Sequence, residues 1–248
     1  MASPPQVADR ERTAHRLLTG SLRRSYEPAV DIDWDAPLDP DKFFLPPKLL
    51  SLYGTPLWDE MTHAERVELS RQETANILSV GIWFENILNQ LLLRMAYDRD
   101  ATSWHVQYAH REIADECRHT IMFGRLIDKM EARPYRQDAF WHNFGRLFPL
   151  LLDGPAMWVA TLMGEEIFDV LQRDTMRDED LQPIVRQVMR IHVTEEARHI
   201  RYAREDLVRR MSRANRLQKE MARYVAAQAG WLLANASTNP EMYARAAL

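Results

Sequence analysis

The chain has 248 residues, 46% of them hydrophobic, with 8 glycines, 12 methionines and a net charge near −4. The scarcity of glycine and the near absence of β-branched alternation predict an all-α fold with a substantial core. The mixed charges exclude a broad basic surface, so we expect no nucleic-acid partner. A single cysteine excludes an internal disulfide framework and favours a reducing compartment, so we expect a cytoplasmic protein.

The first residues are polar and lack the apolar stretch of a secretory signal. The most apolar run, residues 147–164, is interrupted by Asp153, Gly154 and Pro155. A membrane span needs about 20 uninterrupted apolar residues, so this run predicts two buried helical segments around a turn. We therefore expect no membrane partner.

In chain order, residues 1–61 are predicted to form an irregular wrap over a helical region, residues 62–248, within a single domain overall. Residues 1–20 are polar, and we expect a loose start followed by a short helix from Arg12 to Leu18. Residues 21–57 are rich in proline, and their aromatic side chains are predicted to anchor them to the helices. The proposed anchors are Trp34, Phe43, Phe44, Tyr53 and Trp58.

Thr62 and Glu65 form a capping-box pattern, which predicts a long helix that ends near Tyr97. Further helices are predicted for residues 103–133, 137–152, from 154 onward, 178–211 and 213–234. The residues from Pro240 to Leu248 have the pattern of the first turns of another helix, as expected if the natural chain continues beyond Leu248.

Two stretches that are 80 residues apart share the pattern acidic-Glu-x-Arg-His. One contains Glu116 and His119, and the other contains Glu196 and His199. Residues three positions apart lie on one face of a helix, so each pair can direct a carboxylate and an imidazole at the same metal ions. A single Glu-x-x-His is common on solvated helices, but two copies with shared flanking residues indicate a metal site.

Glu85 and Glu165 each lie 31 residues before the glutamate of one of these pairs, in strongly apolar surroundings. A glutamate within a core must be paired, protonated or bound to metal. The matched interval favours Glu85 over Glu73, which has polar neighbours and is expected at the surface or around the site. It likewise favours Glu165 over Glu166.

His192 lies one helical turn before Glu196, on the same stripe as His199. Imidazole and carboxylate together suit iron, manganese or zinc, so we predict that His192 is a third imidazole ligand. The alternative is a hydrogen-bonded core histidine. The matching position 80 residues earlier holds Glu112, which we expect near the metals but not as a ligand.

Asp115 and Glu195 precede the two repeated glutamates and can accept the N–H of a ligand histidine. Arg118 and Arg198 can pair with these acids, although solvated ion pairs are an equal alternative. Cys117 points away from the ligand stripe and is predicted to be a packing residue.

Dimetal helical bundles of the ferritin-like type take one glutamate from each of two helices and Glu-x-x-His from each of the other two. The pattern found here resembles one group of that superfamily, the non-haem diiron arylamine N-oxygenases of the p-aminobenzoate N-oxygenase type. The resemblance covers residues 60–210 and depends on the third histidine, although the first interval is slightly shorter here than in that family. The positions that carry it are Glu85, Glu116, His119, Glu165, His192, Glu196 and His199.

The resemblance implies a ferritin-like four-helix bundle with additional helices, in which these seven residues bind two iron ions, with manganese as an alternative. It implies no catalytic residue beyond the metal ligands. The implied reaction uses O2 as co-substrate to oxygenate the nitrogen of a small aromatic amine, giving hydroxylamine, nitroso or nitro products. An external electron donor, either a reductase or a ferredoxin, and a homodimer are also implied.

Three other functions are compatible with the same residues. The first is a ferroxidase or iron-handling protein without an organic substrate. The second is a radical-generating subunit, which would need a redox tyrosine next to the metals; Tyr108, two turns before Glu116, is a poor candidate for that residue. The third is a bundle without metal, whose carboxylates are solvated.

Overall fold

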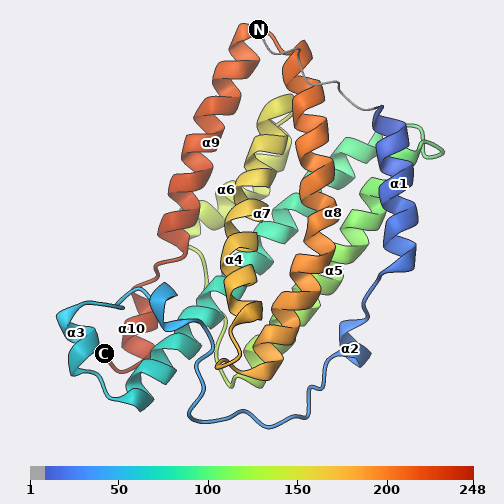
Figure 1. Ribbon diagram of the computed structural model, residues 1–248. Helices are drawn as coiled ribbons and strands as arrows, with labels where there is room; N and C mark the ends of the chain where they lie inside the picture. Colours follow the sequence, from blue (N-terminus) through green and yellow to red (C-terminus); the bar gives the residue numbers. More distant parts are fainter. Residues whose placement is uncertain (1–8) are drawn as a thin grey trace, which may run out of the picture.

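The computed structural model describes residues 9–248, and nearly all of its regular structure is α-helical (Figure 1). Its longest helices are α4 (His63–Tyr97), α5 (Trp104–Lys129), α7 (Gly154–Arg177) and α8 (Pro183–Arg213). Helix α4 packs on α5 and α7 packs on α8, while contacts of α5 with α8 and of α4 with α7 join the two pairs. The described residues contain no strand, and the prediction of an all-α, ferritin-like bundle is confirmed.

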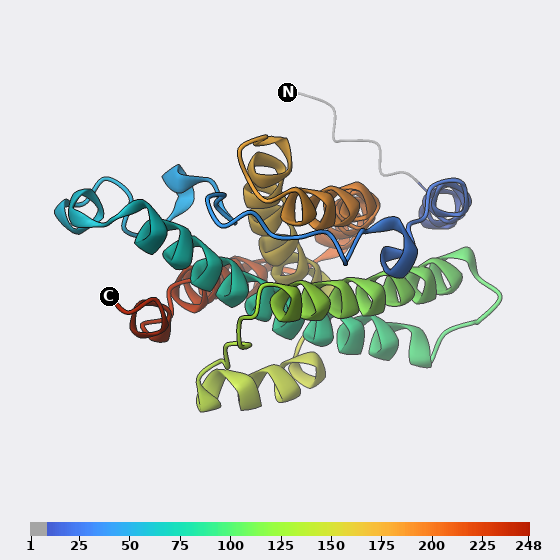
Figure 2. The same ribbon diagram turned by 90° about the horizontal axis from the view of Figure 1, so that it is seen from below.

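Shorter helices cover the outside of this bundle. Helix α1 (Arg10–Arg23) packs on α5 and α8, while α9 (Arg216–Ala236) packs on α7 at the opposite side of the molecule (Figure 1). Helix α6 (Ala139–Leu151) packs outside α4, on the side of the molecule away from α8, as the view from below shows (Figure 2). The remaining short helices are α2 (Pro28–Asp31), a 3-10 turn (Pro47–Leu49), α3 (Pro56–Glu60) and α10 (Glu241–Arg245).

The segment between α1 and α3 crosses the end of the bundle, where the Gln182 side chain holds it by donating to the carbonyls of Asp39 (2.6 Å) and Lys42 (3.0 Å). Most of the expected aromatic anchors are buried or half-buried, namely Trp34, Phe43, Phe44 and Trp58. Tyr53 was predicted wrongly, since 52% of its surface is exposed and its ring contacts only the edge of Trp58. The boundary proposed between residues 61 and 62 stays a prediction.

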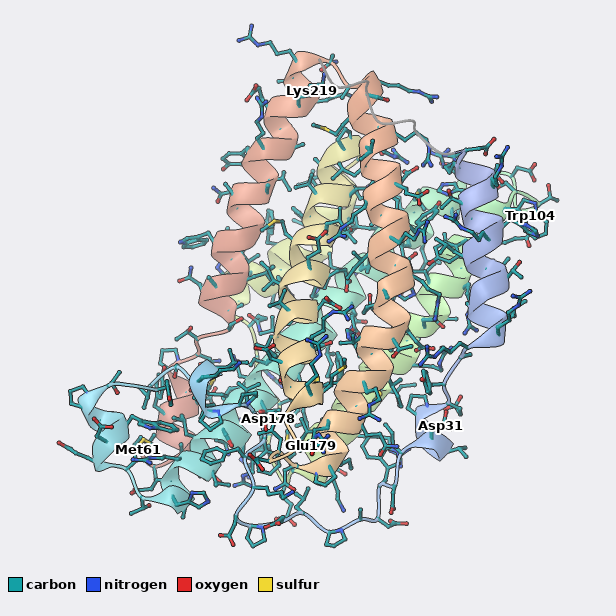
Figure 3. All side chains as sticks on the ribbon, viewed as in Figure 1. Asp31, Met61, Trp104, Asp178, Glu179 and Lys219 are labelled. Atoms are coloured by element: carbon teal, nitrogen blue, oxygen red, sulfur yellow. The ribbon has the colours of Figure 1, made fainter. Side chains whose placement is uncertain are left out.

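The start of α4 agrees with the sequence. Thr62 Oγ1 accepts from the N–H of Glu65, and the Glu65 carboxylate accepts from the N–H of Thr62. Helix α1 is longer than expected, and the loose start predicted over residues 1–8 lies outside the described residues. Trp104 marks the start of α5 (Figure 3), where its ring lies 4.3 Å from that of His15 on α1.

Two helix boundaries differ from the prediction. Helix α5 stops at Lys129 instead of near residue 133, because the chain turns through a positive φ of 54° at Glu131. Helix α8 begins at Pro183 and not at Asp178, which has an extended conformation and ends α7 (Figure 3). Proline lacks an N–H and suits a first helical position, so it marks the true start. Among residues 9–248, no helix combines the length and apolarity that crossing a bilayer requires.

Candidate metal centre

The four long helices bring all seven predicted ligands into the interior of the bundle. Each of these side chains belongs to a residue that is at most 4% exposed. Helix α4 contributes Glu85, α5 contributes Glu116 and His119, α7 contributes Glu165, and α8 contributes His192, Glu196 and His199. Four carboxylates and three imidazoles therefore share one water-poor region.

Helices α4 and α7 approach each other through Phe84 and Gly164. A Cβ atom on Gly164 would lie only 2.1 Å from Cζ of Phe84, so the ring occupies the space that a side chain would need. Glu85 and Glu165 are the next residues along the two helices, so the same approach sets both carboxylates between them. Thr120 supports this position by donating a hydrogen bond of 3.1 Å to Glu85 Oε2.

The two Glu-x-x-His pairs face each other across α5 and α8. His119 Nδ1 lies 3.1 Å from Glu116 Oε2 and 3.1 Å from Glu196 Oε1. His199 Nδ1 lies 2.8 Å from Glu116 Oε1 and 3.1 Å from Glu196 Oε2. Both imidazoles thus direct the same ring nitrogen at the same two carboxylates.

The other ring nitrogen of each imidazole is held by an acidic residue from the opposite helix. His119 Nε2 lies 2.9 Å from Glu195 Oε2, and His199 Nε2 lies 3.3 Å from Asp115 Oδ2. A carboxylate accepts a hydrogen bond at each Nε2 atom and so favours a proton there, while each Nδ1 atom faces the carboxylates of the centre. This crossed pairing could not be read from the sequence, which indicated only that Asp115 and Glu195 can hold a histidine.

Two arginines link these acids from the bundle exterior. Arg118 contacts both Asp115 and Glu195, and Arg198 does the same at 3.3 Å and 3.6 Å. The two acids are at most 1% exposed, so the pairs are buried on the carboxylate side and are not solvated. Although burial alone would raise the pKa of Asp115, its hydrogen bond with His199 and the nearby guanidinium charges hold that pKa below its usual range.

His192 occupies the side of the centre nearest α4 and α7. Its Nε2 atom lies 3.1 Å from Glu85 Oε1 and 3.7 Å from Glu196 Oε1. Its Nδ1 atom donates to the amide oxygen of Gln172 at 2.6 Å. Gln172 therefore orients the imidazole so that Nε2 is free to face the carboxylates, a role that no sequence pattern signalled.

Three groups of these side chains are compact enough to hold a cation, since the donor atoms in each lie within 4.8 Å of one another. The groups are Glu85 with His119 and His192, Glu116 with His119 and Glu196, and Glu112 with Glu116 and His199. Glu112, which was not expected as a ligand, thus joins six of the seven predicted residues. Glu165 belongs to none of the three groups.

Two carboxylates of the centre, those of Glu112 and Glu165, have buried oxygens that no hydrogen bond satisfies within the described part of the chain. Both oxygens of Glu112 and Oε1 of Glu165 have no hydrogen-bond partner among residues 9–248. Burial raises the pKa of Glu165 well above its usual value, that of Glu112 to about 8 and that of Glu85 to about 7. Buried carboxylates without partners are costly unless they are neutralised, so the residues present fit a pair of divalent cations.

Glu73 and Glu166, the alternatives to Glu85 and Glu165 as ligands, lie away from the candidate metal centre. Glu73 is buried, not at the surface, and its carboxylate accepts from the N–H and hydroxyl of Ser51. Glu166 pairs with Arg204 at 2.7 Å on the outside of the bundle. Cys117 is exposed, so its prediction as a packing residue was wrong.

Comparisons with known proteins agree with this arrangement. Residues 7–248 match the family model described as p-aminobenzoate N-oxygenase AurF. Uncharacterized proteins of Mycobacterium bovis and Mycobacterium tuberculosis are each 33% identical over 224 residues, which cover 86% of this chain and 66% of the relative. The chain thus spans slightly less than two thirds of the length of these relatives. The family prediction is confirmed: the chain belongs to the p-aminobenzoate N-oxygenase AurF family, a ferritin-like diiron family.

Proposed function

We propose that this chain is a diiron oxygenase that uses O2 to oxidise the nitrogen of a small aromatic amine. The main support for the proposal is the orientation of the His192 imidazole. Its Nε2 atom faces Glu85 and Glu196, while its Nδ1 atom donates a hydrogen bond to Gln172. Iron storage does not need a third histidine, whereas an oxygenase gains from an additional strong donor at the metal.

Glu116 and Glu196 lie between His119 and His199, and these four residues would hold the ions. Glu85, Glu165 and His192, which line one small cavity, would add donors on one side of these residues, and Glu112, close to Glu116 and His199, would be an eighth donor. Two ferrous ions held there would supply the electrons and Lewis acidity with which dioxygen is converted to an oxidant. An external reductase or ferredoxin would then restore the ferrous state, and a homodimer remains our expectation.

The remaining contributions come from the protein itself. Asp115 and Glu195 keep the Nε2 protons in place, so the two imidazoles hold one orientation throughout the reaction. A small cavity beside Glu85 and Glu165 has aromatic walls, formed by Phe84, Phe123 and Phe168. These walls exclude water, which would otherwise consume the oxidant and weaken the electrostatic field of the site.

The test is to load the protein with Fe(II), add O2 and 4-methylaniline, and measure both iron oxidation and nitrogen-oxidised products by mass spectrometry. The proposal predicts that amine is consumed in proportion to O2. Iron oxidation without any oxidised amine, across 4-methylaniline and p-aminobenzoate, would contradict it and favour a ferroxidase.

His192→Ala provides a direct check, with His142→Ala as its control because His142 is exposed on α6. We expect His192→Ala to lower both bound iron and amine oxidation at least about tenfold, as loss of a metal ligand does. The control variant should match the wild type in both. If His192→Ala binds iron and oxidises amine normally, the third histidine has no part in the reaction.

A further inference from the structure

A cavity of about 430 Å³ lies between α4, α6, α7 and α9. This volume is within the range of about 300–1,000 Å³ found for small-molecule sites. Aromatic and aliphatic side chains form nearly all of its walls, including Phe84, Leu88, Phe144, Phe148 and Val225. No acidic or basic side chain is among its lining residues, so the cavity offers no partner for a charged group.

One aromatic ring separates this cavity from the candidate metal centre. Phe84 lines the cavity on one side and, on the other, the small cavity that Glu85, Glu165 and His192 also line. Its ring lies over the backbone of Gly164, one residue before Glu165. A molecule in the larger cavity is therefore one side chain away from the candidate ligands.

The cavity contains a single buried hydroxyl that lacks a partner. Thr161 is 2% exposed and lines the cavity, and its Oγ1 atom has no hydrogen-bond partner among the described residues. A threonine within a helix commonly donates to the carbonyl four residues earlier, as Thr175 does to Leu171 on the same helix. Buried polar atoms are nearly always satisfied, so this hydroxyl in the cavity wall is suited to hydrogen-bond a polar group of a molecule in the cavity.

Thr161 also lies one helical turn before Glu165, so the two residues share a face of α7. A polar group that hydrogen-bonds Thr161 is thereby set beside the metal-facing end of the cavity, while the apolar remainder of the molecule contacts the aromatic walls. The position of the hydroxyl thus orients an amine nitrogen toward the centre.

We propose that this cavity is the substrate site and that its occupant is an uncharged aromatic amine without a carboxylate. This inference rests on the proposed function and adds the class of substrate to it. A carboxylate in the cavity would lose its hydration without gaining a cation, which is strongly unfavourable. A more polar cavity of about 730 Å³, with Arg136 and Arg146, shares no lining residue with the small cavity beside the metal centre.

Binding of two probes of similar shape tests the proposal. 4-Methylaniline and p-aminobenzoate differ at one ring position, where one has a methyl group and the other a carboxylate. Equilibrium dialysis of the full chain should show 4-methylaniline binding at least about tenfold more tightly, because burying the carboxylate is costly. Trp83 and Trp141 line the cavity, so their fluorescence should respond to the bound amine.

Substitutions of residues that line the cavity test whether the probe binds there. Ala160→Phe or, from α9, Ala229→Phe should fill the space and abolish binding of 4-methylaniline. Thr161→Val should weaken binding of 4-methylaniline about three- to tenfold, the effect of one lost hydrogen bond, and leave toluene binding unchanged. Thr175→Val is the control, since its hydroxyl is satisfied within α7.

The outcomes separate this inference from the proposed function. Binding of 4-methylaniline that depends on Thr161 supports the cavity assignment even if the iron-loaded protein fails to oxidise it, a result that would overturn the proposed reaction only. Equal or tighter binding of p-aminobenzoate would overturn the assignment, as would binding that survives both phenylalanine variants. Unchanged circular dichroism of the variants ensures that lost binding reflects a filled cavity.

Discussion

At the scale of single residues, the centre depends on which atom of each imidazole is protonated. Glu195 and Asp115 hold the Nε2 protons of His119 and His199, each from the opposite helix. This leaves both Nδ1 atoms directed at the shared carboxylates. The ligand geometry is therefore set by residues that do not face the centre themselves.

Glu195→Gln tests this arrangement. Loss of the carboxylate charge makes His119 a weaker and less oriented donor, so we expect iron affinity to fall about 10–100-fold. Affinity can be measured by competition with a chelator under anaerobic conditions. Glu205→Gln is the control, because Glu205 is on the same helix but pairs with Thr13 and Arg201 away from the centre. Equal affinities in the two variants would rule out the orienting role.

Glu112→Gln tests the buried charge of the metal-free protein. Burial raises the pKa of Glu112 to about 8, so the folded protein holds a proton that the unfolded chain has released above its ordinary pKa. The contribution of protonated Glu112 to the unfolding free energy is fully present at low pH and is lost as the pH rises through about 8. Between pH 6.5 and 8 in a chelator, wild type should therefore lose up to about 1 kcal/mol per pH unit relative to Glu112→Gln. Urea unfolding at each pH measures the unfolding free energies of the two proteins. If the two values change with pH in the same way, Glu112 is not a buried, protonated residue.

At this scale the sequence predicted which side chains meet inside the bundle, although it did not indicate every residue that joins them. Matched spacings located Glu85 and Glu165 because helical periodicity converts intervals into directions. The sequence did not indicate that Gln172 holds His192, or that Glu112 lies close enough to His199 to share a cation with it. Both arrangements depend on how separate helices pack against each other. Glu73 looked solvent-facing from its polar neighbours, but the N-terminal segment covers it through Ser51.

At the scale of helices, the approach of α4 to α7 depends on the absence of a side chain at Gly164. The Phe84 ring fills that space and forms the wall between the proposed substrate cavity and the candidate ligands. Capping signals predicted where α4 and α7 begin, because those signals are local. The start of α8 and the end of α5 were placed wrongly by several residues, since acidic residues before Pro183 resemble a helix start when the turn is not known.

Gly164→Ala should disturb this contact. The added methyl group would overlap the Phe84 ring, so we expect a loss of about 1–3 kcal/mol in unfolding free energy. Gly124→Ala, at an exposed position of α5 with no neighbouring atom within 4 Å, should instead be neutral or stabilising by up to about 1 kcal/mol. Urea denaturation of both variants decides the matter, and similar effects would show that α4 and α7 do not depend on this contact.

At the scale of the whole molecule, the bundle encloses the carboxylates of Glu112 and Glu165, which have buried oxygens without a hydrogen-bond partner among residues 9–248. The composition and periodicity predicted the helical class, but the cavity between α4, α6, α7 and α9 arises from outer helices whose positions no local pattern specifies.

Because bound metal would neutralise the buried carboxylates, it should stabilise the entire fold. At a free Fe(II) concentration of about 100 times Kd, thermal unfolding should reflect about 3 kcal/mol of added stability. Equal melting temperatures with iron and with a chelator would count against the centre.

The most direct measurement is the metal content of the purified chain after anaerobic incubation with Fe(II) and removal of unbound metal. We expect two iron ions per chain. We also expect a clear loss of iron in Glu165→Gln and none in Glu166→Gln, because the Glu166 side chain pairs with Arg204 on the exterior. A chain that retains no iron, or that retains the same amount in Glu165→Gln as in wild type, would contradict the proposed centre.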